Sequence, residues 1–142
     1  AYVLWEYDTL AIIAVIGGAV EIYDAYIIWG SGKEVGDFSF VDDIVSGTLM
    51  ACQNVTDGSA INLGTAQRYT MIEACDLIFN ILGWHPKKIV FDRSKPEGVK
   101  TRALDISYAK SLGWKPTHTL QQGLEKTIAW YLQARPKSVE TL

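Results

Sequence analysis

Residues 25–45 read AYIIWGSGKEVGDFSFVDDIV, and this stretch predicts an α/β fold. Residues 25–29 form a short apolar run rich in β-branched and aromatic side chains, which is typical of a buried strand. Three glycines, at positions 30, 32 and 36, predict a tight turn between this strand and a second one. In residues 37–41, DFSFV, apolar and polar side chains alternate with the period of a strand. A helical period begins at Asp42 and predicts a helix to about residue 53, with one face formed by Val45, Thr48, Leu49 and Cys52.

The alternation of strands and helices continues downstream. Residues 60–64 and 87–92 predict strands, and residues 71–82, a short segment after Asp105 and a segment starting at residue 120 predict helices. Thr70 with Glu73, and Thr119 with Gln122, have the spacing of capping boxes. We expect the two capped helices to bury Ala74, Leu77, Ile78, Ile81 and Leu82, and Leu120, Leu124, Ile128 and Tyr131. The strands are too few and too short for a complete doubly wound domain.

Composition limits the classes of partner. The chain has 142 residues, of which 49% are hydrophobic, and a net charge of −3. It therefore has the size of one domain and lacks the basic balance of proteins that bind nucleic acid or anionic membranes. The longest uncharged apolar run, residues 10–20, is too short to span a bilayer. Cys52 and Cys75 fall in helical patterns and are expected to be buried, reduced thiols, which is typical of a cytoplasmic protein.

The ionisable residues most suggestive of chemistry have structural interpretations. Asp42 and Asp43 stand at a helix start, where carboxylates cap free N–H groups and meet the positive end of the helix dipole. Adjacent helical residues point about 100° apart, so capping is favoured over a catalytic pair or a shared metal. His85 and His118 lie in turns that contain a proline and have no partner at metal-ligand spacing, so we expect surface histidines and no metal site.

The sequence contains neither a dinucleotide fingerprint nor a short-chain dehydrogenase catalytic pair. The glycines at 30, 32 and 36 are spaced G-x-G-x-x-x-G and precede a predicted strand, so no helix N-terminus is available to meet a pyrophosphate. No tyrosine has a lysine four residues later, so the Tyr-x-x-x-Lys pair that lowers a tyrosine pKa for general-base work is missing. We therefore expect no catalytic residue and no cofactor site in this chain.

Four segments in order resemble the C-terminal portion of the NAD-dependent epimerase/dehydratase family, the extended short-chain dehydrogenases that act on nucleotide sugars. They are IIWGSGKEVGDFSFVDDIVSG (27–47), AINLGTAQRYTMIE (60–73), SKPEGVKTRALDISYAKSLGWKP (94–116) and TLQQGLEKTIAWYL (119–132). The third segment is nearest to GDP-fucose synthase-like members. The resemblance covers residues 26–135, roughly three quarters of the chain, and the start of the chain matches poorly.

The resemblance implies a partial α/β fold: the substrate-binding domain plus the last strand and helix of a Rossmann sheet, without the complete sheet. It divides the chain into an apolar, helical N-terminal segment (1–25, with the helix at about 9–23), the family-like domain (26–135) and a tail (136–142). In full-length relatives NAD or NADP and the catalytic residues belong to an N-terminal half that does not match this chain. The resemblance thus implies a substrate-binding part that is inactive alone.

The resemblance also implies three substrate-binding residues. Trp29 stands where some members line the nucleotide site with an aromatic residue, and Asn62 is the asparagine of N-x-G, a nucleotide contact in some members. Arg102 is a basic residue that binds phosphate in the family, although on local sequence alone a solvated arginine is an equal interpretation. The arginine that normally precedes DF is replaced by Gly36, and a glycine cannot supply bidentate bonds to phosphate.

Two functions follow as expectations. The first is the C-terminal substrate-binding part of a cytoplasmic nucleotide-sugar epimerase, dehydratase or reductase, whose partner is a nucleotide sugar that is bound weakly or no longer bound. The second is a free-standing, non-catalytic α/β module derived from that family. Such a module would self-associate as a homo-oligomer, or pair with a missing N-terminal half, because apolar surface left by that half must be covered. The sequence specifies neither the sugar nor the base.

Overall fold

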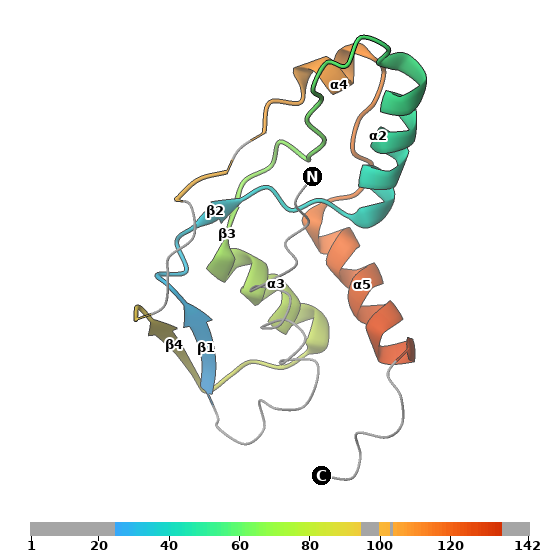
Figure 1. Cartoon of the computed structure of the whole chain (residues 1–142). Helices are drawn as coiled ribbons and strands as arrows, with labels where there is room; N and C mark the ends of the chain where they lie inside the picture. The colour runs from blue at the N-terminus through green and yellow to red at the C-terminus, as the bar shows by residue number, and fades with distance from the viewer. Residues whose placement is uncertain (1–24, 95–99, 103, 135–142) are drawn as a thin grey trace.

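The structure is a computed structural model and describes residues 25–94, 100–102 and 104–134 (Figure 1). The predicted N-terminal helix at 9–23 and the tail at 136–142 lie outside the described residues. The elements in chain order are β1 (Ala25–Trp29), β2 (Val35–Gly36), α2 (Val41–Asn54), β3 (Tyr69–Thr70), α3 (Met71–Leu82), β4 (Lys88–Asp92), α4 (Ser107–Ser111) and α5 (Leu120–Ala134). The predicted α/β class is confirmed. Within the described part, no helix is long and apolar enough to cross a membrane.

The first part of the core lies between α3 and the parallel pair β1–β4. Residues Ala25 to Trp29 pair in register with Lys88 to Asp92. Alternate residues of β1, Tyr26 and Ile28, point to α3 and pack with Cys75 and Phe79. The Tyr26 and Phe79 rings meet edge to face with centroids 5.1 Å apart, and Phe79 is only 1% exposed. Burial of one such ring contributes about 2–3 kcal/mol.

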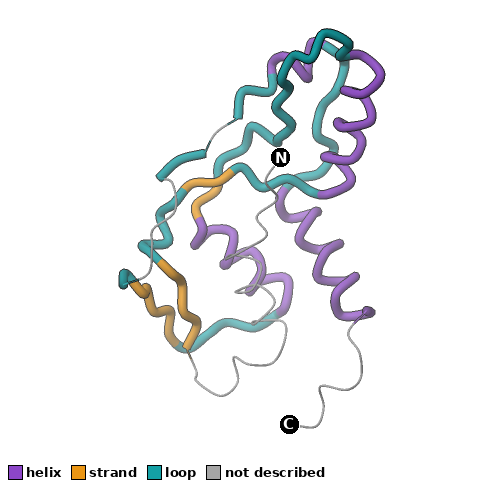
Figure 2. Tube along the Cα trace, viewed as in Figure 1, coloured by secondary structure: helices purple, strands orange, loops and turns teal. Residues whose placement is uncertain are grey.

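The second part of the core joins α3 to α5, so that α3 lies between the strands and α5 (Figure 2). Ile78 and Ile128 are buried at its centre. The partly buried hydrophobic residues around them are Ile81, Leu82, Leu124 and Tyr131. The predicted inward faces of both helices are therefore confirmed, and Cys75 and Phe79 extend the inward face of α3 toward the sheet.

Both predicted capping boxes are present. The Glu73 N–H donates to the Thr70 hydroxyl at 3.2 Å, and the Thr70 N–H donates to the Glu73 carboxylate at 2.7 Å. In the second box, the Gln122 N–H donates to the Thr119 hydroxyl at 3.2 Å, and the Thr119 N–H donates to the Gln122 side-chain oxygen at 2.9 Å. Gly83 ends α3 with φ +63°, a conformation that glycine adopts without steric cost.

Two predicted strands are wrong. Residues 60–64 have no regular structure, and residues 37–40 form a connector between the two-residue strand β2 and the first turn of α2. The alternation in the connector reflects separate tertiary contacts. Asp37 accepts hydrogen bonds from the loop at 65–66, and Phe40 packs against the backbone of Gly123 in α5.

The predicted helix α2 is confirmed, but the face formed by Val45, Thr48, Leu49 and Cys52 is exposed, so the expected burial of Cys52 is wrong. Val45 and Leu49 are 51% and 60% exposed, and Cys52 is exposed, whereas the buried residues of α2 are Asp43 and Gly47. Gly47 allows Leu63 and Trp114 to approach the helix so closely that a Cβ would lie 2.7 and 2.9 Å from them. The helix therefore packs through its smallest residue. Cys75 is buried as predicted, and both cysteines are free thiols.

Candidate functional site

Arg102 is positioned by a short sheet around β2. β2 pairs antiparallel with β3, with Val35 opposite Thr70 and Gly36 opposite Tyr69. On the other side, the Val35 N–H donates to the carbonyl of Lys100 at 3.1 Å, and the Arg102 N–H donates to the carbonyl of Val35 at 2.9 Å. These two bonds form a parallel bridge that carries the exposed Arg102 alongside Gly36.

The space beside Gly36 is covered by an aromatic ring. A Cβ at position 36 would lie 3.2 and 3.3 Å from the Phe38 ring, tighter than ordinary van der Waals contact. An arginine here, as the family resemblance implies, would require the Phe38 ring to shift. In the short sheet, Arg102 lies alongside Gly36, the position at which the resemblance implies a second arginine.

A hydrogen bond ties Asn62 to the segment that follows Arg102, although the two bonded residues are 43 positions apart in the sequence. The Asn62 side-chain N–H donates to the carbonyl of Asp105 at 3.2 Å, and the side chain is exposed. Among the described residues, no donor is placed on the Asn62 side-chain oxygen. This oxygen can therefore accept a hydrogen bond from a ligand.

Trp29 lies at the carboxyl end of β1, and its side chain is 49% exposed. The turn at residues 30–34 separates it from β2. Hydrogen bonds thus join Arg102 to β2, and Asn62 to the segment that follows Arg102.

The turn at residues 30–34 does not fit a dinucleotide pyrophosphate. Gly30 and Gly32 have φ values of +86° and +73°, and the chain continues into β2 without entering a helix. The Glu34 carboxylate accepts hydrogen bonds from the N–H and hydroxyl of Ser31, at 3.1 and 2.9 Å. Burial raises the Glu34 pKa, but hydrogen bonds from the backbone and from the Ser31 hydroxyl outweigh it and lower the pKa. An ionised carboxylate already occupies the donors that a phosphate would need.

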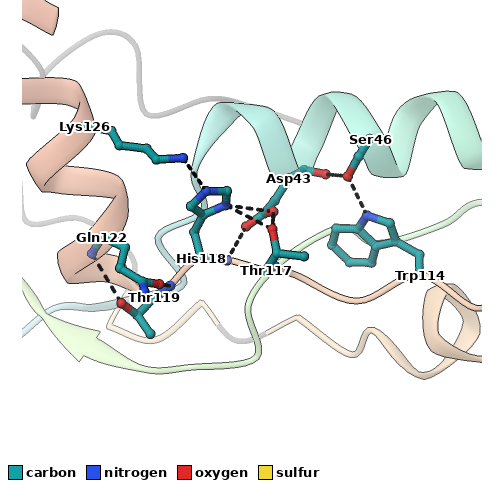
Figure 3. Close-up of polar contacts among 8 residues, drawn as sticks. All are labelled: Asp43, Ser46, Trp114, Thr117, His118, Thr119, Gln122 and Lys126. Carbon is teal, nitrogen blue, oxygen red and sulfur yellow. Dashed lines mark hydrogen bonds and ion pairs between the residues drawn. The ribbon is translucent and has the colours of Figure 1, made fainter.

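Asp43 is not a helix cap but the centre of a buried network (Figure 3). Its side chain is 3% exposed. One oxygen accepts from the N–H and hydroxyl of Thr117 at 3.1 and 2.6 Å, and the other accepts from the N–H of His118 at 3.0 Å. Burial raises the Asp43 pKa, but these hydrogen bonds, with that of the His118 ring, outweigh it and lower the pKa. Asp43 stands in the first turn of α2 as predicted, but the prediction that its carboxylate caps N–H groups of this helix is wrong.

His118 bridges Asp43 and Lys126. The prediction of a free surface histidine is therefore wrong for His118. Its Nδ1 is 3.1 Å from Asp43, and its Nε2 is 2.8 Å from the Lys126 ammonium (Figure 3). An ammonium can only donate, so we assign Nε2 as the acceptor and Nδ1 as the protonated nitrogen that donates to Asp43. Both ring nitrogens are thereby engaged.

The network joins the first turn of α2 to the residues that precede the Thr119 cap of α5. Local spacing could not reveal it, because Asp43 and His118 are 75 residues apart. His85 is exposed as predicted. Within the described residues, no group of three His, Cys, Asp or Glu side chains could hold a metal ion.

Comparison with known proteins identifies relatives for most of the chain. No family model matches it. GDP-L-fucose synthase 1 of Arabidopsis thaliana is 31% identical over 120 residues, which are 84% of this chain and 36% of that protein. The solved dTDP-glucose 4,6-dehydratase of Bacillus anthracis superimposes with a TM-score of 0.78 at 25% identity, covering 94% of this chain and 42% of the other. The UDP-glucose 4-epimerase of Thermotoga maritima gives a TM-score of 0.73 at 28% identity, covering 86% and 39%.

The chain spans about a third of the length of the curated relatives it matches. Those relatives and the solved structures act on sugars linked to GDP, dTDP or UDP, as their names state. Sequence and fold agree over the same large share of the chain. On this agreement, the chain belongs to the NAD-dependent epimerase/dehydratase family.

Proposed function

We propose that this chain is the substrate-binding part of a cytoplasmic nucleotide-sugar epimerase, dehydratase or reductase and is catalytically inactive alone. The observation that carries the proposal is that Arg102 is bonded to β2 and Asn62 to Asp105, three residues after Arg102, in a member of this family. The cytoplasm is supported by the two free thiols. Among the described residues, neither the glycine turn nor the Asp43–His118 network provides an open acid, base or dinucleotide site.

The proposed ligand is the nucleoside diphosphate part of a nucleotide sugar. The Arg102 guanidinium is always charged and suits bidentate bonds to phosphate. The Asn62 side-chain oxygen can accept a hydrogen bond from a base or sugar N–H or O–H. The half-exposed indole of Trp29 offers an apolar face at the carboxyl end of β1. Because Gly36 supplies no second guanidinium, we expect weaker phosphate binding than in members that have an arginine there.

Calorimetric titration of the chain with GDP, UDP and dTDP tests this proposal. We expect Arg102→Ala to weaken nucleotide binding by about 1.5–3 kcal/mol, which raises the Kd roughly 10- to 150-fold. Lys115→Ala is the matched control, because Lys115 is an exposed cation between α4 and α5. If Arg102→Ala and Lys115→Ala weaken nucleotide binding equally, this result would contradict a phosphate contact of Arg102. Turnover of a nucleotide sugar by the purified chain with added NAD or NADP would contradict the proposed inactivity.

A second candidate function is a self-associating module without catalysis. It is favoured by a stripe of three apolar residues on α2, Val41, Val45 and Leu49, which are 51–61% exposed. Residues four apart share one helix face, so two copies of α2 can pack by the same stripe around a two-fold axis. Light scattering over a concentration series tests it. We expect a dimer that Leu49→Gln dissociates. Asn54→Ala is the control that leaves it intact, because Asn54 is exposed and lies nine residues after Val45, on the opposite side of α2.

A further inference from the structure

One carboxylate holds the loop that carries Asn62. Asp37, in the connector after β2, accepts hydrogen bonds from the N–H of Thr65 at 2.8 Å, from the Thr65 hydroxyl, and from the N–H of Ala66 at 2.9 Å. The two segments are 28 and 29 residues apart in the chain. The contact is therefore a tertiary clamp and not a local turn.

The loop conformation depends on this clamp. Ala66 has φ +57°, and among the described residues it is the one non-glycine with a positive φ. Non-glycine residues adopt this conformation where surrounding contacts impose it. Here consecutive N–H groups converge on the Asp37 carboxylate, as in backbone nests that bind anions. Gln67 extends the arrangement, because its N–H donates to the Thr65 hydroxyl oxygen at 3.1 Å.

The other side of the loop is packed against the segment after Arg102. A Cβ on Gly64 would lie 2.8 Å from the Asp37 carboxylate and 3.0 Å from the Leu104 side chain. Asn62 also donates to the carbonyl of Asp105 at 3.2 Å. The loop thus lies between Asp37 and residues 104–105, and movement at either side would displace Asn62 relative to Arg102.

From these contacts we infer that Asp37 is a positioning residue for the nucleotide site. Its carboxylate fixes residues 62–66 so that Asn62 and Arg102 contact one ligand. Asp37 acts through the loop, since three donors already occupy its oxygens. The inference rests on the proposed function for the identity of the ligand, but the clamp itself can be tested without any ligand.

The first test uses NMR resonances of the unliganded chain. We expect Asp37→Asn to shift the backbone amides of Thr65 and Ala66 and the side-chain amide of Asn62, and to speed amide exchange at Thr65 and Ala66 at least tenfold. Asp57→Asn is the matched control, because Asp57 accepts the N–H of Ser59 in a separate exposed turn. An unchanged Asn62 resonance in Asp37→Asn would overturn the inference.

The second test uses titration with GDP, UDP and dTDP. We expect Asp37→Asn to raise the Kd for the nucleotide at least tenfold and Asp57→Asn to leave the Kd unchanged. If Asp37 acts through Asn62, the double variant Asp37→Asn/Asn62→Ala binds no more weakly than Asn62→Ala, whereas additive losses would overturn that route. If the wild-type chain binds none of the three nucleotides, the proposed function and the assignment of the ligand are both wrong. The NMR resonances of the unliganded chain still decide whether Asp37 fixes the conformation of the loop at residues 62–66.

Discussion

At the scale of single residues, two neighbouring aspartates have different roles. Asp42 is exposed in the first turn of α2, whereas Asp43 is buried and accepts hydrogen bonds from Thr117 and His118. If the charge of Asp43 were removed, the hydroxyl and N–H groups of residues 117–118 would lose a charged acceptor and keep only a weaker, neutral one. One position in the chain thus separates a solvated carboxylate from one that ties α2 to α5.

Asp43 makes stability depend on pH. Its pKa is lower in the folded chain than in the unfolded chain, so the unfolded chain binds more protons in acid. The stabilisation is complete above the unfolded pKa of about 3.9 and is lost as pH falls through the folded pKa. We expect chemical denaturation to show the free energy of unfolding falling below about pH 4.

The variants Asp43→Asn and Asp42→Asn separate this network from the general effect of acid. At pH 7 we expect Asp43→Asn to lower the free energy of unfolding by about 1–3 kcal/mol, because buried donors lose a charged acceptor. Its further loss between pH 5 and pH 3 is expected to be smaller than that of the wild type. Asp42→Asn is expected to change stability less and to keep the wild-type pH dependence, and equal effects of both variants would contradict the network.

At the scale of elements, the start of α3 rests on its capping box. We expect Thr70→Ala to lower the free energy of unfolding by about 1 kcal/mol, because the Glu73 N–H loses its acceptor. Thr48→Ala is a matched control, since the Thr48 hydroxyl donates to the Ile44 carbonyl within α2 and its loss leaves no N–H unpaired. Thermal or denaturant unfolding of both variants measures the difference.

The packing of α2 gives a second prediction at this scale. Gly47→Ala gains helix propensity of about 1 kcal/mol but forces a methyl group against Leu63 and Trp114. Overpacking of this kind costs about 1–3 kcal/mol, so we expect net destabilisation. Gly123→Ala in α5 is the graded control, because its closest neighbour, the Phe40 Cβ, lies at 3.1 Å rather than 2.7 Å. A stabilised Gly47→Ala would show that Leu63 and Trp114 move aside.

The elements that could be predicted from sequence are those with local signals. β1, β4, α3 and α5 follow from apolar runs, capping boxes and terminal glycines, which act within a few residues. The segments at 37–41 and 60–64 were predicted incorrectly because Asp37 and the loop at 64–66 satisfy one another across the fold. The roles of Asp37 and Asp43 could not be predicted from the sequence for the same reason, because their partners lie far away in the chain. Long-range pairs leave no period in the sequence.

At the scale of the whole molecule, the chain retains a partial fold of its family with apolar surface still exposed. It matches 33–36% of the length of curated relatives, and α2 exposes Val41, Val45 and Leu49. The order of segments indicated the family from sequence alone. The roles of Trp29, Asn62 and Arg102 came from resemblance, and they remain predictions.

NMR mapping of a bound nucleotide tests whether Asn62 and Arg102 form one nucleotide site. The chain is labelled with ¹⁵N and titrated with GDP, UDP and dTDP, and amide shifts are followed residue by residue. We expect the largest shifts at Asn62, Thr65 and Arg102 and no shifts in α5. Absence of shifts with all three nucleotides, or shifts centred on the cavity between α3 and α5 that Leu77 and Gln121 line, would contradict this expectation.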